Sequence, residues 1–403
     1  MFKLILKLAW NNAFLRLSRT LLVIIMIAVS MSMMLSIQGI YDGMTVNMID
    51  KTKRSDCGEL SIYNPKYRID KVMSNDISNA DVIKASLQER DDVTAVVTRF
   101  SVEGLSATAR KSTFSNIIGI DVEDEKSFGE FEQFLKEGEL KLGKRGTLIG
   151  SELAKTLKVH VGSKVIFSTQ DRHGDINAIA LKVKGIVQTS NITLDASALY
   201  IDRKRLNAFL GTDNTVATQI AIRSESTTLQ ESLQKQYPNL EVKSLLELYP
   251  MLQQMKDMMK IFNSITFFIV MLVVFIGILG VMYVSILDRI REFGIMRAVG
   301  MEYKYIRVQI ILEALFVGVV GYGIGAILGL LSLLYLQQVG LNLSSFADGL
   351  ASFGMDTVIY AHIELSYFSN TFFAIMVASL LSVVLPLKKI KRLNPIEVIK
   401  AET

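Results

Sequence analysis

The sequence contains few of the residues that carry chemistry or crosslinks. Its 403 residues include three histidines, five prolines, one tryptophan and one cysteine, Cys57, so a disulfide within the chain is excluded. The histidines His160, His173 and His362 are far apart, with no cysteine or carboxylate cluster at metal-ligand spacing. A G-x-S-x-G nucleophile motif is also missing. We therefore expect a non-catalytic chain with no metal and no cofactor of its own.

One stretch resembles a nucleotide-binding loop but does not complete it. Residues 138–144 read GELKLGK and fit the pattern GxxxxGK, yet Arg145 occupies the place of the magnesium-binding serine or threonine. We expect no nucleotide here.

Charge is missing from long stretches of the chain. Residues 21–40, 265–287 and 368–387 contain no charged side chain, and residues 310–336 contain only Glu313. Each run reaches the roughly 20 apolar residues that a helix needs to cross a bilayer, and none has the polar face of a soluble helix. The sequence therefore predicts four transmembrane helices. A cleavable signal peptide is the alternative for the first run, but that run is longer than a signal core and no small-x-small cleavage site follows.

The basic residues indicate how the four helices are oriented. Four lysines or arginines precede residue 21, five lie in 288–309, five follow residue 387, and 337–367 has none. Because cytoplasmic loops are enriched in these residues, we expect both termini and the 288–309 loop to face the cytoplasm of a bacterium, with the chain in its inner membrane. Residues 41–260 then lie outside. The net charge of +5 reflects this topology and gives no case for nucleic acid.

The outer segment has the pattern of a mixed α/β domain inserted between the first and second transmembrane helices. A turn is expected at 170–177, and residues 244–264 read as one continuous helix entering the second span, so that two rigid stalks carry the domain. Short β-rich runs occupy 59–63, 94–100, 116–120, 164–168, 179–187, 199–201 and 219–223, and helical patterns occupy 80–88, 130–135, 151–157, 203–210 and 227–236.

Two features of the third apolar run indicate contacts rather than a transport path. The small residues Gly318, Gly321, Gly325 and Gly329 lie on nearly one helix face, which favours close packing of helices within the chain or across a dimer. Glu313 is interpreted as a residue near the membrane surface that reaches lipid headgroups or a neighbouring arginine, in preference to a proton relay.

Several stretches resemble one family of membrane proteins. RIREFGIMRAVGM, beginning at Arg289, and the downstream ILEALFVGVVGYGIGAILG look like the signature of the FtsX-like permease domain in MacB-type (type VII) ABC transporters. KRLNPIEVIKAE resembles the closing segment of that domain. AWNNAFLRLSRTLLVIIMIAVS is similar to the family's first span, and GTLIGSELAKTLKVHVGSKVIF resembles its MacB-like periplasmic core domain.

The resemblance implies a permease subunit that transmits ATP hydrolysis to an outer domain without opening a solute path. It implies three parts: residues 1–40 with the first helix, the extracytoplasmic domain 41–260 with its stalks, and a permease domain 261–403 with the coupling loop 288–309 and a basic C-terminal tail. ATP would be used by a separate ABC ATPase subunit, and a second permease would complete a homodimer or heterodimer. The residues carried over as the ATPase-coupling element are Arg289, Glu292, Gly294, Arg297, Ala298 and Gly300.

Within the family, IQGIYDGM and GELSIYNPKY look most like permeases of the lipoprotein-releasing (Lol-type) group. That likeness implies a lipoprotein or another hydrophobic molecule as cargo at the outer leaflet. Two alternatives remain open, a regulator of an envelope hydrolase and a permease of a tripartite efflux system. The cargo, the type of dimer, the presence of an adaptor and outer-membrane component, and the role of Cys57 are left undecided.

Overall fold

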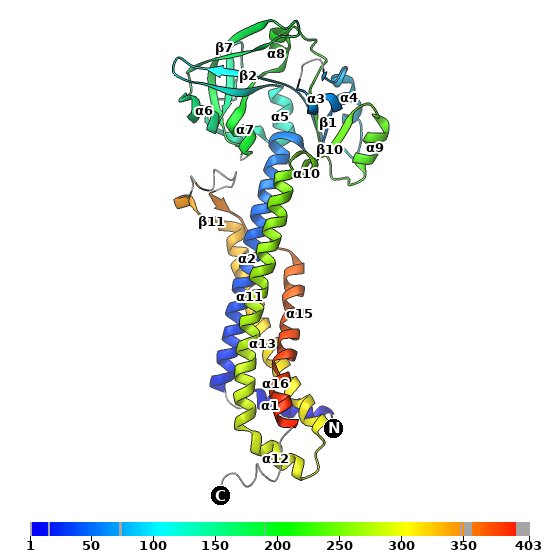
Figure 1. The fold of residues 1–403 in the computed structure, drawn as a ribbon, viewed down its shortest axis with the longest axis vertical. Helices are drawn as coiled ribbons and strands as arrows, with labels where there is room; N and C mark the ends of the chain where they lie inside the picture. The colour runs from blue at the N-terminus through cyan, green and yellow to red at the C-terminus, as the bar shows by residue number, and fades with distance from the viewer. Residues whose placement is uncertain are drawn as a thin grey trace. The chain divides into compact units, whose positions relative to one another are not determined.

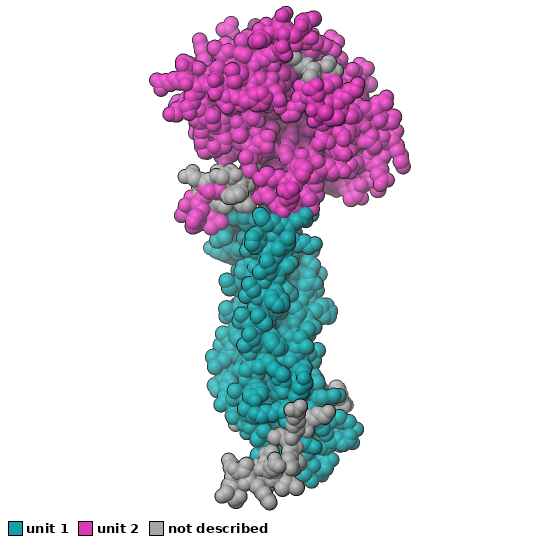
Figure 2. Space-filling view, viewed as in Figure 1, with its two compact units in different colours: residues 1–45, 256–342, 358–403 teal, residues 46–255, 343–357 magenta. Residues whose placement is uncertain are grey.

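The protein is described here from a computed structural model that covers residues 2–14, 17–71, 75–189, 191–346, 349 and 357–391 (Figure 1). The chain divides into two compact units (Figure 2). Unit 1 comprises residues 1–45, 256–342 and 358–403, and unit 2 comprises residues 46–255 and 343–357. Most of the predicted basic tail, and all but the first residue of KRLNPIEVIKAE, lie outside the described residues.

Unit 1 is built from helices. Four helical segments of the described chain are long and apolar enough to cross a membrane: Leu17–Cys57, Pro250–Asp288, Tyr303–Val339 and Leu365–Ile390, so the four predicted apolar helices are confirmed. A short antiparallel pair, β11 (Leu341–Asn342) and β12 (Val358–Ile359), lies between the last two. The helices are α1 (Phe2–Phe14), α2 (Leu17–Thr52), α11 (Pro250–Asp288), α12 (Ile290–Ala298), α13 (Tyr303–Val339), α15 (Leu365–Ser382) and α16 (Val384–Lys391).

The helices of unit 1 differ in how much of their apolar surface is covered. Side chains from α2, α11, α13 and α15, including Ile27, Val274, Ala314 and Ile375, form one buried cluster. In the most apolar window of α11, however, only 17% of residues are buried, against 44% for α2 and 33% for α13. Since a helix that spans a bilayer can expose apolar side chains to lipid, α11 needs no further partner within the chain.

Unit 2 contains a 10-stranded sheet with both parallel and antiparallel pairs. Helices lie between the strands along the chain, as expected for a mixed α/β domain. The strands are β1 (Leu60–Tyr63), β2 (Ala95–Ala107), β3 (Ser112–Ile120), β4 (Leu135–Gly138), β5 (Gly146–Gly150), β6 (Lys164–Gln170), β7 (Ile176–Val187), β8 (Ala198–Asp202), β9 (Gln219–Arg223) and β10 (Glu241–Ser244).

The long strand β2 belongs to two parts of this sheet. Residues 95–99 pair with β9, in the part ordered β10-β1-β9-β2. Residues 100–107 pair with β3, and β6 pairs with both β2 and β7, which closes a ring in the order β2-β3-β8-β5-β7-β6. A buried cluster that includes Phe100, Val165, Phe167 and Leu199 belongs to the ring, and a separate cluster around Ile62 and Ile220 belongs to the other part.

Helices cover parts of this sheet. α4 (Ala80–Gln88) and α9 (Leu229–Gln236) contribute Leu87 and Leu233 to the core of the β10-β1-β9-β2 part. α6 (Ser151–Leu157) and α8 (Arg203–Leu210) contribute to the core of the ring. Among the described residues of the unit, the other short helices are the π-helix η1 (Lys53–Cys57), α3 (Pro65–Ile69), α5 (Val122–Gly129), the 3₁₀ helices η3 (Phe131–Phe134) and η4 (Ser344–Phe346), α7 (Ile192–Ser197) and α10 (Leu245–Leu248).

The helix predictions at 80–88, 151–157 and 203–210 are confirmed to the residue, whereas the one at 130–135 holds only as the short 3₁₀ helix η3 over Phe131–Phe134. There, η3 is followed directly by β4. No α-helix runs through Glu130, because its left-handed φ of 55° ends α5 and separates α5 from η3. The fully buried strand β5 was missed, because a short continuous apolar run carries no alternation to recognise.

The continuous helix expected over 244–264 was wrong. α10 ends at Leu248, Tyr249 adopts φ −119° and ψ 72°, and α11 begins at Pro250. Proline has no N–H to donate and disfavours helical geometry in the residue before it, so the break falls at Tyr249.

Candidate functional site

The predicted coupling residues lie in and around the short helix α12 of unit 1. α11 ends at Asp288, Arg289 has φ −108° and ψ 14°, and α12 then runs to Ala298. Gly300 has a φ of 96°, which a side chain would strain, and α13 starts two residues after Met301. α12 is therefore a short helix, separated by a break at each end from the long apolar helices α11 and α13.

Arg289 fastens the start of α12 to α13. Its Nη1 donates to both carboxylate oxygens of Glu313 at 3.1 Å, and Gln309 donates to the same carboxylate at 3.1 Å. Arg289 is 8% exposed and Glu313 is 3% exposed. The interpretation of Glu313 as the partner of a neighbouring arginine is therefore confirmed. A buried ion pair of this kind holds its geometry because separating it would leave a charge without a partner.

The Arg289 guanidinium also contacts two side chains of α12. Its Nε donates to Glu292 at 3.0 Å, and its Cζ lies 5.2 Å from the ring centroid of the fully buried Phe293. A guanidinium over an aromatic face adds a cation–π attraction to these hydrogen bonds. The first turn of α12 is thus tied both to its own side chains and, through Glu313, to α13.

The coupling residues named from the sequence differ in exposure. Arg289 and Gly294 are buried, Arg297 is half-buried, and Glu292, Ala298 and Gly300 are exposed. The apolar side chains of Ile295 and Val299 are exposed as well, at 48% and 84%. The solvent-facing side of α12 therefore combines a carboxylate with apolar groups, while Arg289 and Gly294 can act only by shaping that side.

A cavity of about 220 Å³ lies beside this turn within unit 1. Val23, Ile278, Met282 and Val317 supply apolar wall, while Asn12, Arg19, Thr20, Arg289, Glu292 and Glu313 supply polar wall. Arg19 forms an ion pair with Asp288 and so joins the start of α2 to the end of α11.

The predicted glycine stripe of α13 lies against α2 and α15 within the chain. A Cβ added to Gly325 would stand 2.7 Å from Met31 Cβ and 2.9 Å from the Ala28 carbonyl oxygen. Added Cβ atoms on the other members would stand 2.9 Å from Ile27 Cβ at Gly321, 2.6 Å from Leu35 Cδ1 at Gly329 and 2.5 Å from Ser379 Oγ at Gly318. These contacts show helix backbones in close approach, the geometry that small residues permit.

Two glycines of α2 that were not singled out from the sequence have similar surroundings. An added Cβ on Gly39 would meet the side chain of Leu333 and the carbonyl of His362, and one on Gly43 would meet the Tyr360 carbonyl. His362 N–H also donates to the Gly39 carbonyl at 2.8 Å. Their spacing of four residues in an apolar helix was a usable signal for this packing.

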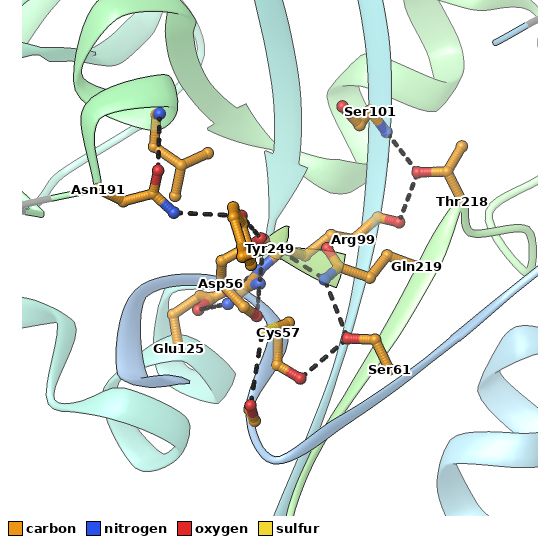
Figure 3. Close-up of polar contacts among 12 residues, drawn as sticks. Asp56, Cys57, Ser61, Arg99, Ser101, Glu125, Asn191, Thr218, Gln219 and Tyr249 are labelled. Carbon is orange, nitrogen blue, oxygen red and sulfur yellow. Dashed lines mark hydrogen bonds and ion pairs between the residues drawn. The ribbon is translucent and has the colours of Figure 1, made fainter. Parts of the chain in front are cut away.

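Unit 2 contains a second buried arginine, Arg99 on β2 (Figure 3). Its Nε and Nη2 donate to the two carboxylate oxygens of Glu125 at 2.5 and 2.7 Å, and its Nη1 donates to the backbone carbonyl of Asp56. Arg99 is 3% exposed and Glu125 is 1% exposed. Burial alone would lower the pKa of Arg99, but Glu125 and Asp56 raise that pKa above its ordinary value, so the arginine stays charged.

Tyr249 completes this arrangement from the break before α11 (Figure 3). Its hydroxyl donates to the carboxylate of Asp56, which lies in η1, and accepts from Asn191 Nδ2 at 3.1 Å. Gln219 also donates to the Asp56 carboxylate, at 3.3 Å. Burial and the nearby Asp56 raise the pKa of Tyr249 well above its usual range, which keeps its hydroxyl protonated as a donor. We call Asp56, Arg99, Glu125 and Tyr249 the junction cluster.

Sequence reasoning missed the junction cluster entirely. Its residues come from η1, β2, α5 and the break before α11, and no spacing pattern connects them. Beside it lies a cavity of about 350 Å³ whose lining includes Asp56, Tyr249 and Gln219. Among the described residues, no group of three or more histidine, cysteine, aspartate or glutamate side chains is arranged to hold a metal ion.

Comparison with known proteins gives two family matches. Residues 20–240 match the MacB-like periplasmic core domain, and residues 264–395 match the FtsX-like permease C-terminal region. Together with the four apolar helices, these matches define a chain that combines a MacB-like periplasmic core domain with an FtsX-like permease region. Because residues 20–240 are more than half of the 403-residue sequence, the chain belongs to the family of the MacB-like periplasmic core domain.

Individual relatives match over shorter stretches. The macrolide export ATP-binding/permease protein MacB 2 of Aeromonas hydrophila is 34% identical over 88 residues, which is 21% of this chain and 13% of that protein. An uncharacterised ABC transporter permease of Methanocaldococcus jannaschii is 24% identical over 228 residues, covering 52% and 55% of the two chains. The crystal structure of the periplasmic region of MacB from Actinobacillus actinomycetemcomitans is 16% identical, covers 48% of this chain and 92% of that one, and has a TM-score of 0.33.

Proposed function

We propose that this chain is the permease subunit of an ABC transporter that passes the motion of a separate cytoplasmic ATPase to an extracytoplasmic domain. In this proposal α12 and both termini face the cytoplasm of a bacterial inner membrane, as the distribution of basic residues predicts. The domain over residues 41–260 lies outside. A second permease, identical or different, completes the complex.

The observation that carries the proposal is the anchoring of α12 by Arg289. A coupling element must present a surface to the ATPase and must also be fixed to the helices that it moves. α12 has both properties, because its Glu292 and Ile295 and the following Val299 are exposed while Arg289 is held by the buried Glu313 of α13. A force applied to the exposed side would therefore reach α13 through a buried, charge-assisted contact.

The cargo is proposed from resemblance alone. Likeness to the lipoprotein-releasing group favours a lipoprotein or another hydrophobic molecule, extracted or moved at the outer leaflet. The name of the Aeromonas relative, a macrolide export protein, favours an efflux permease as the second candidate. In both cases ATP is consumed by the partner subunit.

The test is charge reversal on α12. We expect Glu292→Arg and Arg297→Glu to weaken binding of the partner ATPase at least tenfold, about 1.4 kcal/mol, because opposed charges across an interface become like charges. The permease would be copurified with its ATPase, and ATP hydrolysis measured in proteoliposomes. Arg110→Glu, an exposed reversal on the β2–β3 hairpin of unit 2, is the matched control.

Two outcomes decide the matter. Loss of ATPase binding in the α12 variants, with normal membrane levels and a normal control, supports the coupling role. Full binding and full hydrolysis in both single variants and in the double variant would show that α12 is only a turn.

A further inference from the structure

The junction cluster of unit 2 lies where one strand passes between two parts of the sheet. Arg99 is the last residue of β2 that pairs with β9, and Phe100 is the first that pairs with β3. A displacement of Arg99 along or across the strand therefore acts on both the ring of strands and the β10-β1-β9-β2 part.

The cluster is also where two long helices end or begin along the chain. Asp56 belongs to η1, which directly follows α2, and Tyr249 directly precedes α11. The two are separated by 193 positions in the sequence and are joined by the hydrogen bond from the Tyr249 hydroxyl to the Asp56 carboxylate (Figure 3). A π-helical turn is rare and is found frequently at functional sites.

The energetics of the cluster limit how it can rearrange. Arg99 and Glu125 are almost fully buried, and Arg99 also donates to the Asp56 backbone carbonyl. Separating such charges without new partners is strongly unfavourable, because each would be left buried and unpaired. The bond between Tyr249 and Asp56 is less costly to lose, because only one of its two groups is charged. Movement of α2 or α11 therefore either carries Arg99 along or first breaks the bond between Tyr249 and Asp56.

We propose that Asp56, Arg99 and Tyr249 are positioning residues that deliver displacements of α2 and α11 to both parts of the sheet in unit 2. Tyr249 couples the start of α11 to the end of α2, and Arg99 couples both to β2. The inference rests on the proposed function, because it requires ATP-driven movement of these helices. It adds the residues through which that movement enters the outer domain.

The experiment measures movement within unit 2. Spin labels would be attached at Arg110→Cys, on the β2–β3 hairpin, and Lys235→Cys, on α9, both at exposed positions. The native Cys57 is buried and stays unlabelled. Pulsed electron paramagnetic resonance would give the distance between labels for the permease and its ATPase in nanodiscs, with and without ATP.

Three substitutions are compared in the labelled chain. Tyr249→Phe removes only the hydroxyl and should reduce the ATP-dependent distance change, because movement of α11 no longer reaches Asp56 while α2 stays linked to Arg99. Asp56→Asn keeps an oxygen that accepts from Tyr249 and should retain that change, although it removes a charge beside Arg99. Tyr237→Phe removes a hydroxyl that contacts Ser86 and Gln236 elsewhere in unit 2, and should behave as the unsubstituted chain does.

The comparison separates positioning from simple stabilisation. If the cluster only stabilises unit 2, Asp56→Asn lowers the melting temperature more than Tyr249→Phe and reduces the distance change more. That order would overturn the inference, and so would a full distance change in Tyr249→Phe. Absence of any ATP-dependent change in the unsubstituted chain would instead overturn the proposed function, and the inference with it.

Discussion

Two buried arginines, one in each unit, are held by pairs of carboxylates in different ways. Arg289 is paired with Glu292 and Glu313, and Arg99 with Glu125 and Asp56. Glu292 is 58% exposed at its side chain, so the Arg289 pair opens to solvent. Glu125 is 1% exposed, so the Arg99 pair is closed. The Arg289 pair, which opens to solvent at Glu292, is suited to a surface that binds a partner. The buried Arg99 pair is suited to holding elements together inside the domain.

The comparison also concerns distance along the chain. Arg289 directly precedes α12, and Glu313 lies in the next helix, α13, 24 positions along the chain. The junction cluster joins residues that are up to 193 positions apart. A local cluster can be recognised from a motif, whereas a cluster assembled by the fold cannot.

The largest effect is expected from removing the closed arginine. Arg99→Met would leave Glu125 buried without its partner, so we expect a loss of about 3–5 kcal/mol in the stability of unit 2. Arg90→Met, which removes a partly exposed pair with Asp92, should cost about 0–1 kcal/mol. Thermal unfolding of the purified permease, followed by circular dichroism, measures both. Equal melting temperatures for the two variants would show that the buried Arg99 pair contributes no more to the stability of the protein than the partly exposed Arg90 pair does.

A smaller effect is expected at the glycine stripe. Gly325→Leu would force α13 away from Met31 and Ala28 of α2, and overpacking of this kind costs about 1–3 kcal/mol. Gly323→Leu is the matched control on the same helix, because no atom lies within 4 Å of its added Cβ. Resistance to detergent unfolding would be compared for the two variants. If Gly323→Leu proves as damaging as Gly325→Leu, close packing against α2 is not the reason for the glycine.

The smallest effect is expected at the turn after α12. Gly300→Ala meets open space, so its cost arises only from the φ of 96° and should be about 1 kcal/mol. Gly280→Ala, in open space within α11, should be neutral or slightly stabilising because alanine favours helix. The two melting temperatures should therefore shift in opposite directions. A stabilising Gly300→Ala would contradict the strained backbone.

The sequence was sufficient for features that repeat or are local. The four apolar helices followed from uncharged runs, and Glu313 could be read as the partner of an arginine because few charges were available in its surroundings. Helices such as α6 and α8 were predicted to the residue, because their apolar positions recur at helical spacing.

The remainder depended on tertiary structure or on single residues. Glu130, where a helix was predicted to begin, adopts a left-handed conformation, and Pro250 interrupts a stretch that otherwise has a helical pattern. Arg99 read as an ordinary charged residue within a β-rich run, and only the crossing of β2 between two parts of the sheet reveals its burial. The roles of the six proposed coupling residues stay predictions.

The most direct test of the central claim is to ask which part of the permease touches the ATPase. A photo-crosslinking amino acid would replace Ile295 on α12 or Val299 directly after it, both of which are exposed, or Ile176 in unit 2, which is 80% exposed. Irradiation of membranes that contain the whole complex should join the ATPase to the chain from positions 295 and 299 and not from position 176. Crosslinks to the ATPase from position 176, or none from α12, would contradict the account.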